Sequence, residues 1–247
     1  MLVIGDFGSG VSTEDRVAAA MQDMAKSRPV DAFVTTGDNL YKNDVDSTWK
    51  QPFGWVDQAG IPVFAAWGNH DVASGARARA VQEALNPPGD WYWVRIGPAN
   101  LVVLDGNDPT NQEQLGWLDE TLANLPAGPT LVSFHQPAYS CGSHGSTKAI
   151  DEEWVPRFEQ AGVDLVLNGH DHDYQRFEVS GITYVVTGAG GRGLYSVGSC
   201  PRGTPDPIAS NDTDHSFMVV TVSVDHIHAQ AISSNGETLD DFSLPAG

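Results

Sequence analysis

Residues 163–172, Val-Asp-Leu-Val-Leu-Asn-Gly-His-Asp-His, join a short apolar run to a polar segment of histidines and aspartates. The run 163–167 has the length of a buried β-strand, and Gly169 ends it. His170, Asp171 and His172 therefore follow the carboxyl end of a strand. In α/β sheets this is the edge at which ligands bind.

The same pattern occurs at four earlier places in the chain. The predicted strands are Leu2–Gly5, Ala32–Thr36, Val63–Trp67 and Leu131–Phe134. The segments that follow them are Asp6-Phe7-Gly8, Gly37-Asp38-Asn39-Leu40-Tyr41, Gly68-Asn69-His70-Asp71 and His135. An isolated Asp beside a Gly is usually a turn residue, but five such strand ends in a row are not explained by turns. We expect these carboxylates, imidazoles, amide and phenol to converge at one sheet edge.

Helical spacing of apolar residues alternates with these strands. Helices are predicted over Ser12–Ser27, Ala76–Leu85, Gln112–Leu125 and Ile150–Gln160. Ser12 and Asp15 form a capping-box-like start to the first of them. Alternating strands and helices predict an α/β fold.

Strands continue after residue 172 with no helices between them. Ile182–Thr187 is a predicted strand, and Phe217–Val224 with Ile227–Ser233 reads as a hairpin. These late strands predict a second, more antiparallel sheet. The intervening stretch Gly188–Asp214 is rich in Gly, Pro and Asp and predicts a long surface loop. We interpret His226 and His228 on the hairpin as structural residues.

Length and composition set the class of protein. The chain has 247 residues, of which 40% are hydrophobic, enough for a full core and for one domain over residues 1–247. No apolar run reaches the 18 residues that a membrane span requires. The 13 basic against 32 acidic residues give a net charge of −19, which argues against long nucleic acids as partners. An anionic substrate must therefore be attracted by a local site.

As a set, these motifs resemble those of the purple acid phosphatases, within the calcineurin-like metallophosphoesterase superfamily. The resemblance covers residues 6–172 in order and spacing. Its most discriminating residue is Tyr41. Most superfamily members carry a histidine where this chain has Gly8, and Tyr41 offers a replacement oxygen.

The resemblance implies a four-layer αββα sandwich of class α/β (α+β), with two mixed sheets face to face and helices outside. It also implies two metal ions bridged by Asp38. The first would be held by Asp6, Asp38, Tyr41 and His172, and the second by Asp38, Asn69, His135 and His170. Hard anionic donors favour Fe(III) at the first position, and the second donor set suits Zn, Fe(II) or Mn.

The implied activity is hydrolysis of phosphate monoesters by attack of a metal-bound hydroxide. An alternative is a phosphodiesterase acting on small or cyclic diesters with the same metal site. A non-catalytic metal-binding module is a third hypothesis, which predicts loss of a catalytic residue. We assign His70 to transition-state stabilisation or protonation of the leaving group; otherwise it only orients its loop. His144 and Tyr139 are possible substrate contacts, and Arg192 either reaches a phosphate or is solvated.

Cys141 and Cys200 either form one disulfide or are two buried thiols. A disulfide would indicate a secreted or otherwise extracytoplasmic protein. The first residues already read as a strand, and no signal peptide is recognisable. We therefore expect a longer precursor. The sequence predicts no oligomeric state.

Overall fold

The computed structural model describes residues 1–245 and arranges them as two mixed β-sheets with helices on both outer faces. The first sheet has the strand order β13 (Thr238–Pro245), β12 (His226–Ser233), β11 (Ser216–Val222), β1 (Leu2–Ile4), β2 (Phe33–Thr35), β3 (Val63–Ala65). The second has the order β10 (Ala209–Asn211), β8 (Tyr174–Val179), β9 (Ile182–Thr187), β7 (Leu165–Asn168), β6 (Thr130–Ser133), β5 (Ala99–Val103), β4 (Tyr92–Ile96).

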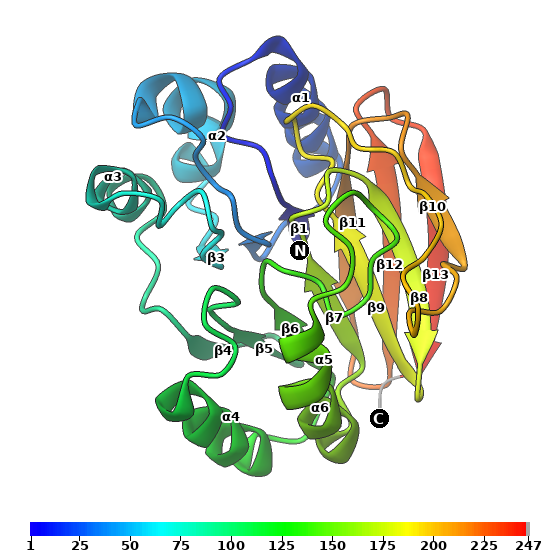
Figure 1. Ribbon diagram of the computed structural model, residues 1–247. Coiled ribbons are helices and arrows are strands. Elements are labelled where there is room, and N and C mark those ends of the chain that lie inside the picture. Colours follow the sequence, from blue (N-terminus) through cyan, green and yellow to red (C-terminus); the bar gives the residue numbers. More distant parts are fainter. Residues whose placement is uncertain (246–247) are drawn as a thin grey trace.

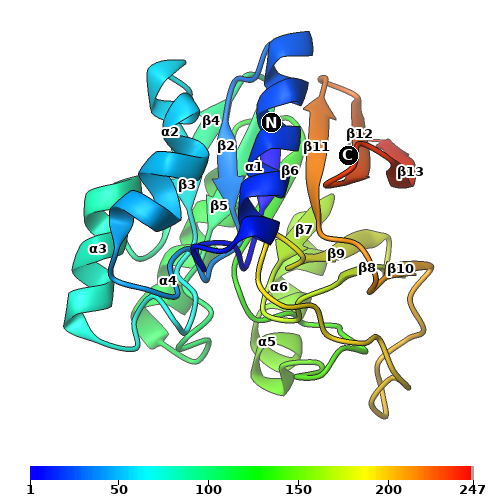
Figure 2. The ribbon, with the colours of Figure 1, turned by 90° about the horizontal axis from the view of Figure 1, so that it is seen from above.

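Helices cover the two outer faces, so the fold has four layers (Figures 1 and 2). The first sheet is covered by α1 (Ser12–Ser27), the π-helical turn η1 (Asp46–Lys50), α2 (Gln51–Gln58) and α3 (Gly75–Leu85). The second is covered by α4 (Gln112–Asn124), α5 (Lys148–Glu153) and α6 (Val155–Ala161). The predicted fold class, with two mixed sheets between helical layers, is confirmed.

Alternation along the strands builds the core between these layers. In β1, Leu2 and Ile4 pack against the helices, whereas Val3 packs between the two sheets. In β6, Leu131 faces the inter-sheet layer and Val132 faces the helices of the second sheet. Side chains of a strand point alternately to its two faces, and here both faces are buried, so each run is apolar throughout.

Parallel pairing brings the polar strand ends together. β1, β2 and β3 are parallel, with Ile4 opposite Thr35 and Thr35 opposite Ala65. In the second sheet β6 and β7 are parallel, with Ser133 opposite Leu167. The two sheets also meet at this edge, because the Ser133 hydroxyl donates a hydrogen bond of 3.2 Å to the Thr35 carbonyl. The segments after all five strands therefore reach one region.

The predicted helices over 12–27, 76–85 and 112–125 are observed within a residue at either end. The predicted Ile150–Gln160 helix is wrong in detail, because the chain forms α5 and α6 with a break at Trp154. Pro156 lies in the first turn of α6. Since proline has no N–H to continue the preceding helix, the chain restarts a helix there.

The late strands do not form a separate antiparallel sheet. β11 pairs antiparallel with β1, so β11, β12 and β13 extend the first sheet, while β8 and β9 extend the second. The stretch Gly188–Asp214 is not wholly loop, because Ala209–Asn211 pairs with β8 as β10. The sequence reasoning missed this strand because three polar or small residues at a sheet edge carry no apolar pattern.

The capping box predicted for α1 is absent. Val11 is the N-cap and makes no side-chain cap bond. Instead the carboxylate of Glu14 reaches back and accepts hydrogen bonds from the N–H groups of Ser9, at 2.8 Å, and Gly10, at 2.6 Å. The turn between β1 and α1 is thus held by a buried carboxylate. The segments η1, α2, β8 and β13 were also not predicted.

Candidate metal centre

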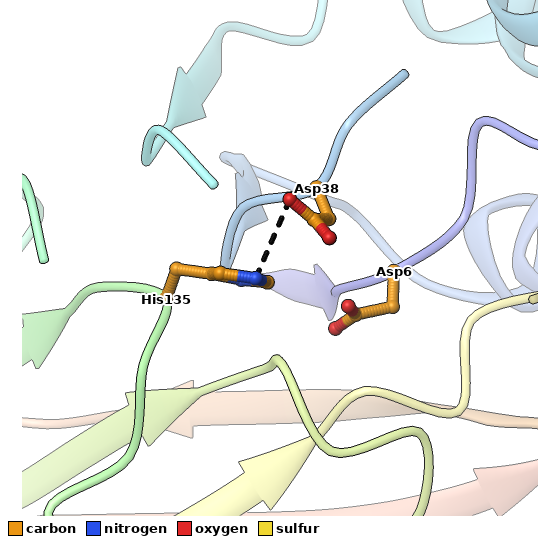
Figure 3. A group of neighbouring side chains, drawn as sticks. All are labelled: Asp6, Asp38 and His135. Atoms are coloured by element: carbon orange, nitrogen blue, oxygen red, sulfur yellow. Dashed lines mark ion pairs between the residues drawn. The ribbon is translucent and has the colours of Figure 1, made fainter. Parts of the chain in front are cut away.

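The seven predicted ligands lie in segments that follow strands at the shared sheet edge. We call them the candidate centre: Asp6, Asp38, Tyr41, Asn69, His135, His170 and His172. Asp6 and Asp38 follow β1 and β2, and His135 follows β6; ligand atoms of these three residues all lie within 4.8 Å of one another (Figure 3). All three residues are buried.

One half of the candidate centre gathers around Asp6. The Tyr41 hydroxyl donates to Asp6 Oδ1 at 3.0 Å and lies 3.1 Å from His172 Nε2. His172 Nε2 is itself 3.4 Å from Asp6 Oδ1. A carboxylate, a phenol and an imidazole therefore face one point, and they are three of the four ligands that the resemblance implies for the first ion.

The other half gathers around Asp38. His135 Nε2 lies 3.4 Å from Asp38 Oδ1 and 3.3 Å from His170 Nδ1 (Figure 3 marks the Asp38–His135 pair). Two imidazole nitrogens at such a separation must share a proton or a cation. The Asn69 side-chain oxygen is buried and has no hydrogen-bond partner within the described chain. Such an unpaired buried oxygen is costly unless it has a ligand.

Outer hydrogen bonds orient two of the histidines. His135 Nδ1 lies 2.9 Å from the Thr36 carbonyl, and His172 Nδ1 lies 2.8 Å from the Gly193 carbonyl. In each ring the δ nitrogen is therefore a donor, and the ε nitrogen is turned to the centre. Metal-ligating histidines are oriented by the same kind of contact.

The backbone is strained where it delivers these groups. Asp6, Asp38 and His170 have φ angles of 57°, 48° and 74°, in the left-handed region that L-residues rarely adopt. Strain of this kind persists where surrounding structure over-determines it, and it is concentrated at functional sites. A side chain at Gly68 would clash with Asp38, since its Cβ would lie 2.2 Å from Asp38 Oδ1.

The carboxylates create a field that favours a positive charge. Burial lowers the pKa of His135, but Asp38 and Asp6 outweigh it and raise that pKa to about 10. Burial and the positive field of His135 lower the pKa of His170 to about 3, so this imidazole is neutral. Burial, with Asp6 and Asp38, raises the pKa of Tyr41 far above its ordinary value. The field that holds a proton on His135 would equally hold a metal cation.

Three features show that these residues fit metal ions. The donors are oxygens and imidazole nitrogens, the Asn69 oxygen has no hydrogen-bond partner within the described chain, and the oriented histidines turn their ε nitrogens toward the other candidate ligands. Carboxylate, phenol and imidazole are ligands of iron, zinc and manganese.

Less buried groups surround the candidate centre, and we call four of them the rim: His70, His144, Arg192 and Tyr195. The His70 side chain is 50% exposed, and the backbone N–H of His70 donates to Asp38 Oδ1 at 2.8 Å. The His144 ring stacks on the His170 ring at 4.2 Å between centroids. Tyr195 stacks on His172 at 4.0 Å and lies 5.4 Å from His144. Sequence reasoning missed Tyr195, because it follows no strand.

Tyr139, predicted as a substrate contact, is not brought to this group. Its side chain is buried, its ring packs against Tyr184 at 4.9 Å, and its hydroxyl donates to Asp151 at 2.9 Å. His228 forms an exposed pair with Asp241 at 2.8 Å, away from the centre, consistent with its interpretation as structural.

Two buried aspartates organise the loops and were not assigned by sequence reasoning. Asp71 accepts hydrogen bonds from the backbone N–H groups of Asn39, Leu40 and Gly68, which flank the candidate ligands. Asp171 accepts from the His144 N–H at 2.7 Å and also from the Ser140 hydroxyl and the Gly145 N–H. The strand-end pattern includes both aspartates but does not indicate this role, because most of their partners are distant in the chain.

Cys141 and Cys200 form a disulfide, so of the two alternatives the bridge is correct. It joins the loop that carries His144 to the loop that carries Arg192 and Tyr195. The Gly198 N–H also donates to the Cys141 carbonyl at 2.8 Å. Both sides of the rim are therefore tied to each other.

Comparison with known proteins identifies the family of the chain. The sequence profile of the family described as calcineurin-like phosphoesterase matches residues 1–174. The chain belongs to this family and is a metal-dependent phosphoric ester hydrolase by class. Among residues 1–245, none of the helices combines the length and apolar character that crossing a membrane would need.

Within the family the chain is similar to purple acid phosphatases. It is 28% identical to purple acid phosphatase 17 of Arabidopsis thaliana, covering 85% of this chain and 71% of the relative. It is 26% identical to tartrate-resistant acid phosphatase type 5 of Rattus norvegicus, covering 99% of this chain and 89% of the relative.

Solved structures show the same fold at lower identity. One, titled as GAP50, the anchor in the inner membrane complex of Plasmodium, superposes with a TM-score of 0.83 at 19% identity, over 100% of this chain and 88% of that one. The purple acid phosphatase of yellow lupin superposes with a TM-score of 0.78, also at 19% identity, over 99% of this chain and 53% of that one.

Proposed function

We propose that this chain is a dinuclear metallophosphatase that hydrolyses phosphate monoesters. Asp6, Asp38, Tyr41 and His172 would hold one ion, and Asp38, Asn69, His135 and His170 the other. The observation that carries the proposal is the buried group of Asp6, Asp38 and His135, whose ligand atoms lie within 4.8 Å of one another. The Asn69 oxygen has the chemistry of a further metal ligand, and it has no hydrogen-bond partner within the described chain.

When bound, two cations would polarise the phosphoryl group and activate water at neutral pH. The other roles in the proposal belong to residues of the chain. Asp38 lies between the two halves of the centre, and its position is held by the His70 N–H. His70 carries a half-exposed imidazole 3.9 Å from Asp38 Oδ2, where it would donate a proton to the leaving oxygen.

His144 is the proposed substrate contact on the opposite loop. Its ring is stacked on His170, and its backbone is held by buried Asp171. An imidazole held in this way can donate a hydrogen bond to a phosphoryl oxygen without losing much conformational freedom on binding. Tyr139 is not part of the proposal, because its hydroxyl is engaged by Asp151.

The first experiment compares release of p-nitrophenol from p-nitrophenyl phosphate and from bis(p-nitrophenyl) phosphate, with wild type, His70→Ala and His226→Ala. Wild type should prefer the monoester, and His70→Ala should lose about 100-fold in kcat, as expected for loss of a general acid. His226→Ala removes an exposed histidine outside the centre and should match wild type. Preference for the diester would favour the phosphodiesterase alternative; no turnover with any metal would refute both.

A second measurement tests the proposed metals. We propose Fe(III) at the Tyr41 position, with Zn, Fe(II) or Mn at the other. Metal analysis should find about one iron per chain, and a visible absorption band should disappear in Tyr41→Phe. A colourless, active protein that contains only zinc or manganese would refute the Fe(III) assignment and leave phosphoester hydrolysis in place.

We further propose that residues 1–247 act as one catalytic domain in an extracytoplasmic compartment on a small phosphate ester. The disulfide supports an oxidising compartment. The charge of −19 argues against long nucleic acids. Comparing the enzyme from a secreted and a cytosolic expression host, by free-thiol titration and activity, would test the first point.

A further inference from the structure

Arg192 differs from the other basic residues of the chain. Of the Lys and Arg side chains in residues 1–245, only that of Arg192 contacts a ring of the candidate centre: its guanidinium lies 4.8 Å from the centroid of Tyr41. The side chain is exposed, and within the described chain it makes no hydrogen bond or ion pair. Some basic residues elsewhere are engaged by carboxylates, as with Arg157 and Asp119 at 2.8 Å, or Arg176 and Asp240 at 2.7 Å.

Backbone hydrogen bonds hold the segment around Arg192 next to the candidate centre. Its N–H donates to the carbonyl of Asp6 at 3.0 Å, and the Gly190 N–H donates to the Gly5 carbonyl at 3.0 Å. The Thr13 hydroxyl donates to the Gly191 carbonyl at 2.6 Å. This short segment therefore runs alongside the end of β1, and the Cα of Arg192 has a defined place beside a candidate ligand.

Glycine is required in that segment for the close approach. A Cβ on Gly190 would lie 2.2 Å from the Gly5 carbonyl oxygen, and one on Gly191 would lie 2.8 Å from the Cα of Glu14. Gly191 also has φ at +152°, which disfavours other residues. The glycines thus allow the backbone to pass close to the end of β1, and this places the long cationic side chain of Arg192 beside the candidate centre.

The net negative charge of the protein explains why a cation at this position would help to bind an anionic substrate. A phosphate ester approaching a protein of net charge −19 is repelled over most of the surface. A guanidinium offers several N–H donors in a planar fork that matches phosphate oxygens, and charge-assisted bonds of this kind are the strong ones. Stacking on the Tyr41 ring orients the group while leaving those N–H donors free.

We propose that Arg192 binds a non-bridging phosphoryl oxygen of the substrate and positions the ester over the candidate centre. The proposal rests on the proposed phosphoesterase function and adds a residue to it. Arg192 acts in binding the anion, so its removal raises KM and the dissociation constant of orthophosphate and leaves kcat nearly unchanged.

The test uses metal-reconstituted protein and three variants: Arg192→Gln, Arg192→Lys and the control Arg202→Gln. Arg202 is an exposed arginine of the same loop region and makes no ring contact. Orthophosphate binding is measured by isothermal titration calorimetry. The constants kcat and KM are measured with p-nitrophenyl phosphate as substrate. Arg192→Gln should raise KM and the orthophosphate Kd by about 10-fold, the size of one charged hydrogen bond, with Arg202→Gln within about twofold. Arg192→Lys should recover part of the loss, since lysine keeps the charge without the fork.

Unchanged phosphate binding in Arg192→Gln, or an equal loss in Arg202→Gln, would overturn the proposal while the wild-type turnover upholds the phosphoesterase. A fall in kcat at constant KM would overturn it too, because Arg192 would then act on the chemistry. If wild type shows no turnover, the proposed function fails, and the calorimetric comparison still decides whether Arg192 binds the anion.

Discussion

The candidate centre and the rim contrast in how they are built. Residues of the centre follow strands directly, and Asp6, Asp38 and His135 are at most 1% exposed. Residues of the rim are on loops, are exposed or half-buried, and are held by Asp171, by the disulfide and by ring stacking. The centre takes its geometry from two rigid sheets, whereas the rim depends on contacts between distant loops.

Breaking the centre should have the largest effect. Asp38→Asn removes the carboxylate shared by both halves, so it should abolish binding of at least one ion and lower kcat/KM by about 10³-fold or more, because metal stabilisation contributes several kcal/mol. Metal content and turnover of p-nitrophenyl phosphate measure this. Asp23→Asn, an exposed aspartate of α1, is the matched control and should change neither. Full metal content in Asp38→Asn would contradict the bridging role.

Removing the disulfide of the rim should mainly lower the stability of the fold. Cys141→Ser with Cys200→Ser opens a closure across a sequence separation of 59, so the free energy of unfolding should fall by about 4 kcal/mol in the chain-entropy model. Denaturant titration measures the loss. Metal content should persist, because no ligand of the centre is altered. If the double variant bound no metal, the geometry of the centre would depend on the disulfide of the rim, contrary to this prediction.

Glu14 tests how the first loop of the centre is supported. Burial, its largest influence, raises the pKa of Glu14 from 4.5 to about 7, although the Gly10 and Ser9 N–H groups act against this. Between these values the unfolded chain releases the proton and the folded chain keeps it, so stability is lost as pH rises from about 4.5 to 7.

Glu14→Gln should remove this part of the pH dependence. The free energy of unfolding of wild type, relative to that of the variant, should fall by up to about 3 kcal/mol as the pH rises from about 4.5 to 7. Denaturant curves at pH 4.5, 6 and 7.5, at equal metal content, measure it. A difference that stays constant with pH would show that Glu14 does not titrate in this range.

The fold alone does not decide catalysis. One solved structure with this fold is titled an anchor, at a TM-score of 0.83. The distinction is in the site. Here the groups proposed for catalysis are all present, including His70 beside Asp38. The non-catalytic hypothesis, which predicts the loss of such a residue, therefore has no support in this chain.

The sequence by itself predicted the strands that carry the candidate centre and several of the helices. Short apolar runs, each followed by Asp, Asn or His, predict parallel strands whose ends meet, because strand direction fixes the edge at which those residues emerge. Asp6, Asp38 and His135 follow this rule, and their distances agree with it. The period of the apolar residues likewise predicted α1, α3 and α4.

Only the tertiary structure decided which strands share a sheet and what forms the rim. β11 joins β1 across more than two hundred residues, and no local pattern specifies that partner. Asp71 accepts from the Leu40 N–H and Asp171 from the His144 N–H, Tyr195 stacks on His172, and Arg192 contacts Tyr41. These contacts join residues that are distant in the chain, so their geometry exists only once both sheets have packed.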